Sequence, residues 1–311
     1  MLEHGGKLRA AARRWNIPLA DWLDLSTGIA PRPYPVPAVP AEVWQRLPED
    51  DDGLEAAACD YYGARHLLPM SGSQAAIQML PRLFAPGRVA IPAPIYNEHP
   101  GAWQVAGHTR VGWGDPSDYA VVCNPTNPTG QRYSRTELME RARRVRLLVV
   151  DEAFLDAEPE ASLIGGGADN VVVLRSLGKF FGLAGARVGC AIGAPDLLAR
   201  LAEKLGPWTV ANPARWAARH ALADRDWQAV QRERLKAGSQ RLAESLRALG
   251  EPTGTALFQY VATPRAAELF DAFARRGILV RRFDDPSALR FGLPANDNEW
   301  RRLARALKEM A

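Results

Sequence analysis

Hydrophobic residues in the middle of the chain gather in short runs, and amphipathic stretches of helical length lie between them. The runs that predict strands are residues 89–91, 120–123, 147–150, 171–174 and 188–192. The stretches that predict helices are residues 73–83, 135–145 and 196–205. Strands and helices that alternate in this way are typical of α/β proteins. We therefore predict a mostly parallel, doubly wound sheet with helices on both faces.

The last hundred or so residues follow a different pattern. Residues 211–249 are rich in Ala, Arg and Leu and contain no proline after Pro213, so they predict one or two long helices. Glu299 follows Asn296 by three residues, as in a capping box at the start of a last helix. Between these helices we expect strands at residues 257–262, 278–282 and 289–292 and a helix at residues 265–276. These mixed elements predict a small α+β domain.

The change of pattern near Trp208 divides the chain into two predicted units. Residues 45–208 form a large domain, and residues 1–44 and 209–311 form an N-terminal segment plus a small C-terminal domain. A length of 311 residues is enough for about two domains. Residues 31–40 contain five prolines, so this stretch cannot form a regular helix and is expected to run extended over the surface.

Composition and charge narrow the class of protein. The chain is 47% hydrophobic and 24% charged, which is ordinary for a globular protein and excludes a disordered one. The net charge is only +4, and the basic run at residues 141–146 has no nucleic-acid recognition motif beside it, so we expect no nucleic-acid partner. We also expect no membrane span, since no apolar stretch reaches about 18 residues.

The cysteines and the first residues bear on location and metal binding. Cys59, Cys123 and Cys190 lie far apart, and neither they nor the histidines have metal-ligand spacing, so we expect no metal. An odd, sparse cysteine count fits a reducing compartment. The N-terminal residues lack the apolar core of a secretory signal. The expected location is therefore the cytoplasm.

Polar and aromatic side chains follow four of the predicted strands, at the edge where ligands bind in open α/β sheets. The first of these strands is followed by Tyr96 and His99. The second precedes the loop Asn-Pro-Thr-Asn-Pro-Thr-Gly, which contains Asn127, and the third precedes Asp151-Glu-Ala-Phe. The fourth precedes Leu-Gly-Lys-Phe-Phe-Gly-Leu-Ala-Gly-Ala-Arg, within residues 176–187. Four such segments in succession indicate a site at this edge.

Lys179 is the strongest candidate for chemistry in the last of these segments. It lies among apolar residues such as Phe180 and Phe181, where an ammonium group is poorly solvated. Such surroundings lower the pKa of a lysine and favour the neutral amine that Schiff-base chemistry needs. Ser176 and Arg187 flank it with a hydroxyl and a guanidinium that suit a phosphate. The alternative is an exposed lysine at the start of a helix.

Three motifs together resemble the fold-type-I pyridoxal-phosphate enzymes, the aspartate aminotransferase superfamily. They are Ser-x-x-Lys with an arginine eight residues after the lysine, the loop around Asn127, and the Asp-Glu-Ala-Phe segment that begins at Asp151. The resemblance covers roughly residues 45–300. It implies the fold-type-I architecture, pyridoxal 5′-phosphate as the cofactor, and a homodimer.

The resemblance also implies a role for each candidate residue. Lys179 bonds the cofactor covalently, Asp151 pairs with the pyridine nitrogen and keeps the ring an electron sink, and Tyr96 stacks on the ring. These three are the expected catalytic residues. The other expected cofactor contacts are His99 near Asp151, Asn127 at the ring oxygen O3′, and Gly72, Ser73, Gln74, Ser176 and Arg187 at the phosphate.

Two positions depart from the pattern of this superfamily. Phe154 stands where many relatives have a tyrosine whose hydroxyl helps hold O3′, so we expect that contact to be absent. Leu47-Pro48 stands where many have a Tyr-Pro pair whose tyrosine reaches the neighbouring subunit's cofactor phosphate. The neighbour is therefore expected to contribute less to the phosphate site than usual.

Finer features resemble the L-threonine-O-3-phosphate decarboxylases of cobalamin biosynthesis. They are the His-Gly-Gly motif at residues 4–6, the segment 24–30, Phe154, a short chain, and the ending at residues 291–300. The resemblance implies conversion of L-threonine O-3-phosphate to (R)-1-aminopropan-2-ol O-2-phosphate with loss of CO2. The partner molecule would thus be a small phosphorylated amino acid.

The resemblance also indicates where the substrate binds. Arg290 lies in a Leu-Arg-Phe-Gly segment that resembles the strand bearing the substrate-carboxylate arginine, although a surface arginine is an alternative. Gly28 and Ala30 stand where many of these decarboxylases have asparagines, which weakens any substrate role for these two positions. The expected substrate contacts are His4, Gly5, Gly6 and Arg290, with a frayed terminus as the alternative for the first three.

Two other functions stay open at this point. A pyridoxal-phosphate aminotransferase of the histidinol-phosphate type would share every cofactor residue. The reaction depends on which bond at Cα lies perpendicular to the ring, and no sequence pattern shows that angle. The other alternative is a non-catalytic binding or regulatory protein with the same fold, against which Lys179 and its neighbours argue.

Overall fold

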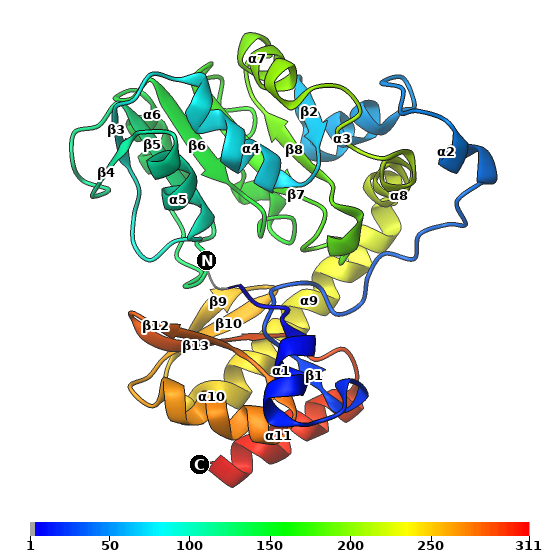
Figure 1. Ribbon diagram of the computed structural model, residues 1–311, viewed down its shortest axis with the longest axis vertical. Coiled ribbons are helices and arrows are strands. Elements are labelled where there is room, and N and C mark those ends of the chain that lie inside the picture. The colour runs from blue at the N-terminus through cyan, green and yellow to red at the C-terminus, as the bar shows by residue number, and fades with distance from the viewer. Residues whose placement is uncertain (1–3, 311) are drawn as a thin grey trace.

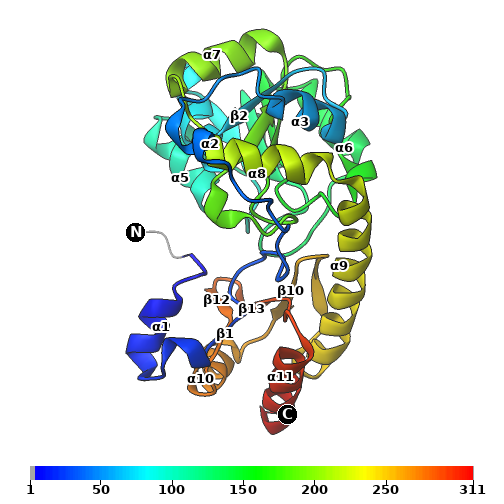
Figure 2. The same cartoon turned by 90° about the vertical axis from the view of Figure 1, so that its right-hand side faces the viewer.

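In the computed structural model, which describes residues 4–310, the chain forms two lobes that are linked by the long helix α9 (Arg225–Leu246) (Figures 1 and 2). The upper lobe in Figure 1 is built on a seven-stranded sheet with the strand order β2-β8-β7-β6-β5-β3-β4. The strands β4, β3, β5, β6 and β7 are parallel to one another, whereas β8 runs antiparallel to both β7 and β2. This confirms the mostly parallel sheet. The strand bounds are β2 (Leu67–Met70), β3 (Arg88–Ala90), β4 (Thr109–Val111), β5 (Tyr119–Cys123), β6 (Leu147–Asp151), β7 (Val171–Ser176) and β8 (Gly189–Ile192).

Helices cover both faces of this sheet, as a doubly wound fold requires. Successive strand residues belong to different cores, because Val121 packs with the helices of one face and Val122 with those of the other, and both are fully buried. Strands buried on both faces read as continuous hydrophobic runs, which is why the sequence pattern located them. One face carries α4 (Ser73–Met79), α5 (Glu98–Val105) and α7 (Pro195–Leu205), and the other carries α3 (Leu54–Tyr62), α6 (Arg135–Ala142) and α8 (Asn212–Ala223).

The lower lobe holds a four-stranded antiparallel sheet in the order β12-β13-β10-β9. The N-terminal segment packs on this lobe, since β1 (Leu23–Asp24) pairs in parallel with β11 (Ile278–Leu279) and α1 (Leu8–Trp15) contacts α10 (Ala266–Arg275). This confirms the α+β character of the small domain. The other bounds are α2 (Ala41–Gln45), β9 (Pro252–Thr255), β10 (Phe258–Ala262), β12 (Arg281–Asp284), β13 (Ser287–Gly292) and α11 (Asp297–Met310).

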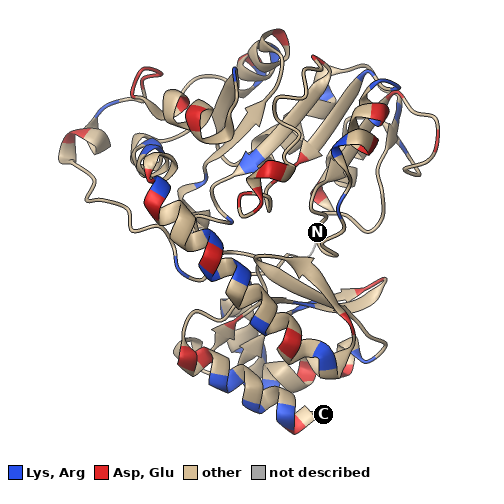
Figure 3. Ribbon diagram, turned by 180° about the vertical axis from the view of Figure 1, so that it is seen from behind, with Lys and Arg blue, Asp and Glu red and all other residues tan. Residues whose placement is uncertain are grey.

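Helices α8 and α9 connect the two lobes. Helix α8, which follows Trp208 in the chain, packs on α2 and α3 of the upper lobe, while α9 runs down to β9 and β10 of the lower lobe (Figure 2). Acidic and basic residues are interspersed along α9 (Figure 3). Among the described residues, no helix combines the length and the hydropathy that crossing a bilayer needs. The domain boundaries given above stay a prediction.

One helical stretch differs from the sequence expectation, and a second follows one of its two expected arrangements. The helix expected over residues 73–83 becomes a 3-10 helix at Leu80–Leu83, because Pro81 lacks the N–H that an α-helix needs. The long stretch after Pro213 forms two helices, as one of the expected arrangements had it. They are divided at Asp224, whose side chain accepts the Trp227 N–H at 2.9 Å and caps α9. Both helix boundaries arise from single side chains.

The expected capping box at the last helix is only half formed. Asn296 Oδ1 accepts the Glu299 N–H at 3.1 Å, but the Glu299 carboxylate accepts the N–H of Ala295 at 2.6 Å instead of that of Asn296. The return bond is therefore shifted by one residue. A complete capping box occurs at Ser134 and Glu137, where α6 begins.

The proline-rich segment 31–40 contains no helix or strand and is mostly exposed, as expected. Tyr34 is the buried exception, and its N–H donates to the carbonyl oxygen of Phe181 at 2.9 Å. Gln231 of α9 donates from its amide to the Arg32 carbonyl at 3.2 Å. These two bonds attach the proline-rich segment to Phe181, two residues after Lys179, and to α9.

Candidate active site

The residues expected at the site converge on one cavity of about 360 Å³ between the two lobes. Its position beyond the carboxyl ends of the parallel strands is the usual ligand site of such a sheet, and its volume lies within the range of about 300–1,000 Å³ for small-molecule pockets. Gly72 and His99 lie just behind the wall, beside Arg187 and Asp151 respectively. The expected residues that line the cavity are His4, Gly5, Gly6, Ser73, Gln74, Tyr96, Asn127, Asp151, Ser176, Lys179, Arg187 and Arg290.

Lys179 follows strand β7 and carries its amine into this cavity. Its Nζ is 5.4 Å from the centroid of the Phe154 ring. Burial lowers the pKa of Lys179 to about 8; the positive charge of Arg290 adds to this shift, and Asp151 opposes it. An amine with this pKa is readily deprotonated near neutral pH, which is the form that attacks a carbonyl carbon.

Aromatic packing fixes the backbone on the C-terminal side of Lys179. Phe180 and Phe181 are fully buried, and both rings pack on Trp227 of α9, with Phe181 stacked at an interplanar angle of 13°. The Lys179 carbonyl oxygen accepts the Ala30 N–H at 2.9 Å. Because these neighbours are anchored in a close-packed core, the lysine side chain is held toward the cavity.

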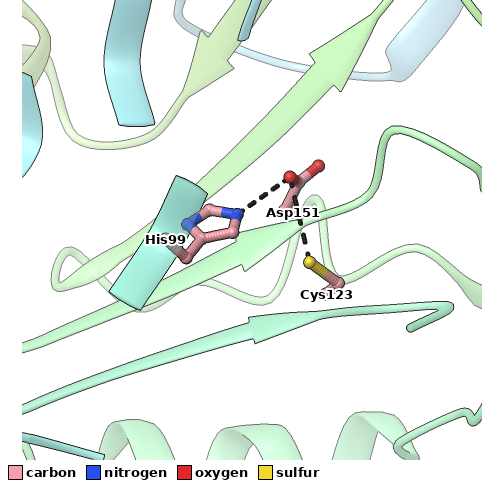
Figure 4. Close-up of side chains that lie close together, drawn as sticks. All are labelled: His99, Cys123 and Asp151. Carbon is pink, nitrogen blue, oxygen red and sulfur yellow. Dashed lines mark hydrogen bonds and ion pairs between the residues drawn. The ribbon is translucent and has the colours of Figure 1, made fainter. Parts of the chain in front are cut away.

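Asp151 is the last residue of strand β6, and both of its carboxylate oxygens have partners. His99 Nε2 lies 2.9 Å from Oδ2, and the Ala153 N–H donates to Oδ1 at 3.1 Å. The Cys123 thiol donates to Oδ2 at 4.0 Å from the neighbouring strand β5 (Figure 4). The exposed fractions of Asp151 and His99 are 6% and 1%. This buried carboxylate is therefore held in one orientation at the floor of the cavity.

The same three side chains form a group of potential metal ligands. His99, Cys123 and Asp151 each offer one ligand atom, and these atoms lie within 4.8 Å of one another (Figure 4). No other such group occurs within residues 4–310. His99 and Asp151 already share a hydrogen bond that a metal would have to replace, whereas the N–H of a pyridinium needs only one free lone pair of the carboxylate. The group therefore suits a cofactor nitrogen better than a metal.

The turn before α4 touches the start of strand β8 and forms one end of the cavity. A Cβ on Gly189 would lie 2.4 Å from the Ser73 nitrogen, and one on Gly72 would lie 2.6 Å from Arg187 Nη2. Gly72 has a φ of +74°, and Arg187 has a φ of +54°, which is uncommon for a residue other than glycine. The N–H groups that open α4, the Ser176 hydroxyl and the Arg187 guanidinium are thus hydrogen-bond donors gathered at one end of the cavity, and such donors suit a phosphate.

Arg290 enters the cavity from strand β13 of the lower lobe. Its Nη1 donates to Asn127 Oδ1 at 2.5 Å and its Nη2 to the Ser26 carbonyl oxygen at 3.2 Å, while Nε has no partner. Burial, together with the smaller effect of the positive charge of Arg281, lowers the pKa of Arg290 to about 10, so the group is still a cation at neutral pH. A buried cation with an unused donor indicates that an anion binds here.

Sequence reasoning missed part of the cavity wall. Cys123 could have been found, because it is the last residue of β5 and lies opposite Asp151 in the sheet. Arg281, which lies outside the wall but whose charge acts on Arg290, could also have been found, since it lies opposite Arg290 on β12. The small and apolar residues carried no chemical signal. The wall residues that were not predicted are Thr27, Gly28, Ile29, Cys123, Ala153, Phe154 and Ala184.

Phe154 explains why a glycine stands at position 28. A Cβ on Gly28 would lie 2.7 Å from the Phe154 ring and 3.0 Å from the Phe258 ring. Phe154 is 7% exposed and packs edge to face on Phe258, with 5.1 Å between centroids, so it cannot easily move away. The asparagine that many of the decarboxylases have at this position therefore does not fit beside Phe154. Leu47, the second position that departs from the superfamily pattern, is exposed on the surface of the upper lobe.

The residues around the cavity fit pyridoxal phosphate. Lys179 supplies an amine of lowered pKa, and Asp151 supplies a fixed carboxylate on the floor. Ser176 and Arg187 supply donors for the phosphate, and the glycine at position 72 leaves room for the arginine. Groups of these kinds suit an aldehyde, a pyridine nitrogen and a phosphate respectively.

Comparisons with known proteins agree with this fit. The chain matches the family Aminotransferase class I and II over residues 114–307. It is 55% identical to the threonine-phosphate decarboxylase of Pseudomonas aeruginosa, covering 99% of this chain and 97% of that one, and 42% identical to that of a Sinorhizobium species, covering 99% and 98%. The solved histidinol-phosphate aminotransferase of Sinorhizobium meliloti, in complex with pyridoxal-5′-phosphate, has the same fold with a TM-score of 0.84 and 20% identity, covering 100% of this chain and 96% of that one. The fold class expected from the sequence is confirmed, and the chain belongs to the aminotransferase class I and II family of pyridoxal-phosphate enzymes.

Proposed function

We propose that this enzyme decarboxylates L-threonine O-3-phosphate to (R)-1-aminopropan-2-ol O-2-phosphate and CO2, a step of cobalamin biosynthesis. The observation that carries the proposal is the similarity over nearly the full chain to two threonine-phosphate decarboxylases, at 55% and 42% identity. The cavity supports it, because Arg290 and residues 4–6 line the same space as Lys179. The substrate carries a carboxylate and a phosphate, so the cavity needs two groups of hydrogen-bond donors in addition to the amine of Lys179.

The proposed chemistry uses residues at the floor of the cavity. Pyridoxal phosphate, when bound, supplies the electron sink for the pair released as the bond between Cα and the carboxylate breaks. Asp151 would hold the pyridine N–H, while His99 and the Ala153 N–H keep its carboxylate in place. Lys179 would return a proton to Cα from Nζ, and its pKa of about 8 suits a group that accepts and donates a proton near neutral pH.

Arg290 is proposed to govern which bond breaks. Its orientation is fixed by the bonds to Asn127 and to the Ser26 carbonyl, so the donors left over point in fixed directions. An arginine that keeps the substrate carboxylate near the ring plane favours loss of the Cα proton. In a decarboxylase, we propose that Arg290 engages the phosphate or tilts the carboxylate out of that plane.

The second candidate function is that of a histidinol-phosphate aminotransferase. It is favoured by the fold, since the solved enzyme with a TM-score of 0.84 carries that name. The likeness to that structure, at 20% identity, concerns the fold alone. Mycobacterial relatives with the same name are 35% identical over 86% of this chain, whereas the decarboxylase relatives are 55% and 42% identical over 99% of it. The decarboxylase therefore stands first.

One experiment separates the two candidates. The holoenzyme is incubated with threonine phosphate and, separately, with histidinol phosphate plus 2-oxoglutarate. Release of CO2 in the first mixture and no glutamate in the second support the decarboxylase. Glutamate formation with no CO2 supports the aminotransferase.

We also propose a homodimer whose interface includes α2 and the segment before α8. The large apolar side chains there are strongly exposed, at 68% for Trp44, 62% for Leu47 and 59% for Trp208. Leu47 lines a cavity of about 260 Å³ between α2 and α8. Apolar surface of this kind is typical of a protein interface. Light scattering tests the proposal, since Trp44→Glu should give monomers and a monomeric wild type would refute it.

A cytoplasmic location is likewise a proposal. Cys59, Cys123 and Cys190 are all free thiols, which suits a reducing compartment. Fractionation of cells that express the protein tests this, because enzyme recovered in a secreted or membrane fraction would contradict it.

A further inference from the structure

Glu98 is a carboxylate at the edge of the site that the proposed reaction does not use. It is the first residue of α5, and its side chain is 16% exposed. Its Oε2 accepts hydrogen bonds from the side-chain amides of Gln74 at 2.8 Å and Gln78 at 3.2 Å, and its Oε1 lies 2.8 Å from His4 Nε2. One carboxylate thus joins helix α4 to the N-terminal segment.

On the cofactor side, Glu98 sets the orientation of Gln74. With Nε2 of Gln74 bonded to Glu98, the oxygen of the same amide faces the Tyr96 hydroxyl at 3.4 Å. Burial raises the pKa of Tyr96 to about 12, and the charge of Glu98 adds to this, so the hydroxyl stays protonated and donates to Gln74. Gln74 and Tyr96 both line the cavity.

On the substrate side, Glu98 holds one end of residues 4–6. The other end is held by the lower lobe, where the Gly6 N–H donates to Ser26 Oγ at 2.8 Å. Gly5 lies so close to this lobe that a Cβ would be 2.2 Å from the Ser26 carbonyl oxygen. Residues 4–6 therefore bridge the two lobes beside the cavity, where the N-terminal chain enters the space between them in Figure 1.

We propose that Glu98 is a positioning residue for the substrate phosphate, which acts by fixing the ring of His4 at the cavity wall. This inference rests on the proposed function. When Nε2 donates to Glu98, Nδ1 is the remaining polar edge of the ring, and it donates to a phosphate oxygen when the imidazole is protonated. The His4 side chain is 41% exposed, so without Glu98 it would sample several rotamers in water before substrate binds.

The test compares the Glu98→Gln holoenzyme with the wild type, and uses Glu203→Gln, an exposed glutamate of α7, as the matched control. The probe is phosphoethanolamine, which has the amine and the phosphate but no carboxylate to lose, and ethanolamine is the probe without phosphate. Binding is followed by the absorbance change of the cofactor. For phosphoethanolamine, we expect the Kd of Glu98→Gln to rise about tenfold, as for loss of a charge-assisted hydrogen bond. Ethanolamine binding and both Kd values of Glu203→Gln should stay unchanged.

Two further readouts separate positioning from a purely structural role. The KM of Glu98→Gln for threonine phosphate should rise about tenfold while kcat stays within about twofold, and hydrogen exchange at the Gly6 N–H should become faster. Equal weakening of both probes, or a lower kcat with an unchanged KM, would overturn the proposal. Another outcome is that the wild type binds phosphoethanolamine more tightly than Glu98→Gln does and yet releases no CO2 from threonine phosphate. In that case the proposed function fails and the phosphate-positioning role stands.

Discussion

The guanidinium of Arg290 donates to the side-chain oxygen of Asn127, and this bond links the lower lobe to the loop that follows strand β5. Because the oxygen of the Asn127 amide is occupied, its Nδ2 is the end that can donate to the cofactor oxygen O3′. The arginine expected to meet the substrate therefore also orients the asparagine expected to meet the cofactor. A change at Arg290 should affect both ends of the site.

We expect Arg290→Lys to raise the KM for threonine phosphate about tenfold or more. A lysine cannot bond Asn127 and the Ser26 carbonyl at once in the geometry that the guanidinium has. In a decarboxylase, the residual turnover should still release CO2. Steady-state kinetics with product analysis checks this, and Arg282→Lys on the neighbouring strand β12 is the control, because Arg282 pairs with Asp284 instead. If Arg290→Lys transaminates threonine phosphate and the wild type does not, the arginine determines which bond at Cα breaks.

We expect Asp151→Asn to keep the cofactor bound but to lower kcat. A neutral amide does not hold the pyridine nitrogen protonated, and loss of a charge-assisted hydrogen bond costs about 1.5–3 kcal/mol, or about one to two decades in rate. The absorbance of the bound cofactor and the rate of CO2 release are measured on the same sample. Near-normal turnover would rule out the proposed role of Asp151.

The pKa of Lys179 predicts how the apoenzyme takes up pyridoxal phosphate. Burial and Arg290 lower this pKa to about 8, so the neutral amine, and with it the rate of covalent uptake, should increase as the pH rises through about 8. Arg290→Gln removes a nearby positive charge and should move this midpoint to higher pH, while Arg282→Gln should not.

Borohydride reduction followed by mass spectrometry locates the bond. The label should be on Lys179 and absent from Lys179→Ala. A label on another lysine would show that the wrong residue was assigned. In the pH profile of cofactor uptake, a midpoint near the ordinary lysine pKa of about 10.5 would contradict the burial argument.

We expect Gly28→Ala to destabilise the protein by about 1–3 kcal/mol, since the added Cβ would overlap the Phe154 ring. Phe154→Leu in the same chain should recover part of this loss, because the smaller side chain opens the space. Gly114→Ala is the control, as nothing lies within 4 Å of a Cβ there. Urea unfolding of the three variants measures the effect, and equal stability of Gly28→Ala and Gly114→Ala would refute the packing argument.

The sequence could predict the five inner strands of the central sheet because they are largely buried on both faces, whereas the edge strands β2 and β4, which are partly exposed, were not predicted. Runs such as residues 147–150 are uniformly hydrophobic for that reason, and the chemistry follows each run where the strand ends. Helix ends were less predictable, since single side chains such as Pro81 and Asp224 decided them.

Contacts between distant segments could not be predicted. The sequence indicated His4 and Arg290 as separate candidates, but the carboxylate of Glu98 beside the first and the amide of Asn127 beside the second depend on how the lobes meet. The close approach of Gly28 to the Phe154 ring has the same origin. Such pairs lie far apart in the chain, and no local periodicity records them.

The central claim is that the enzyme breaks the bond between Cα and the carboxylate. The most direct measurement is a single turnover of the wild-type holoenzyme with threonine phosphate labelled at the carboxylate carbon. The account predicts one labelled CO2 and one (R)-1-aminopropan-2-ol O-2-phosphate per active site, with the cofactor returned as pyridoxal phosphate. Accumulation of pyridoxamine phosphate with the label still in the organic product would contradict it.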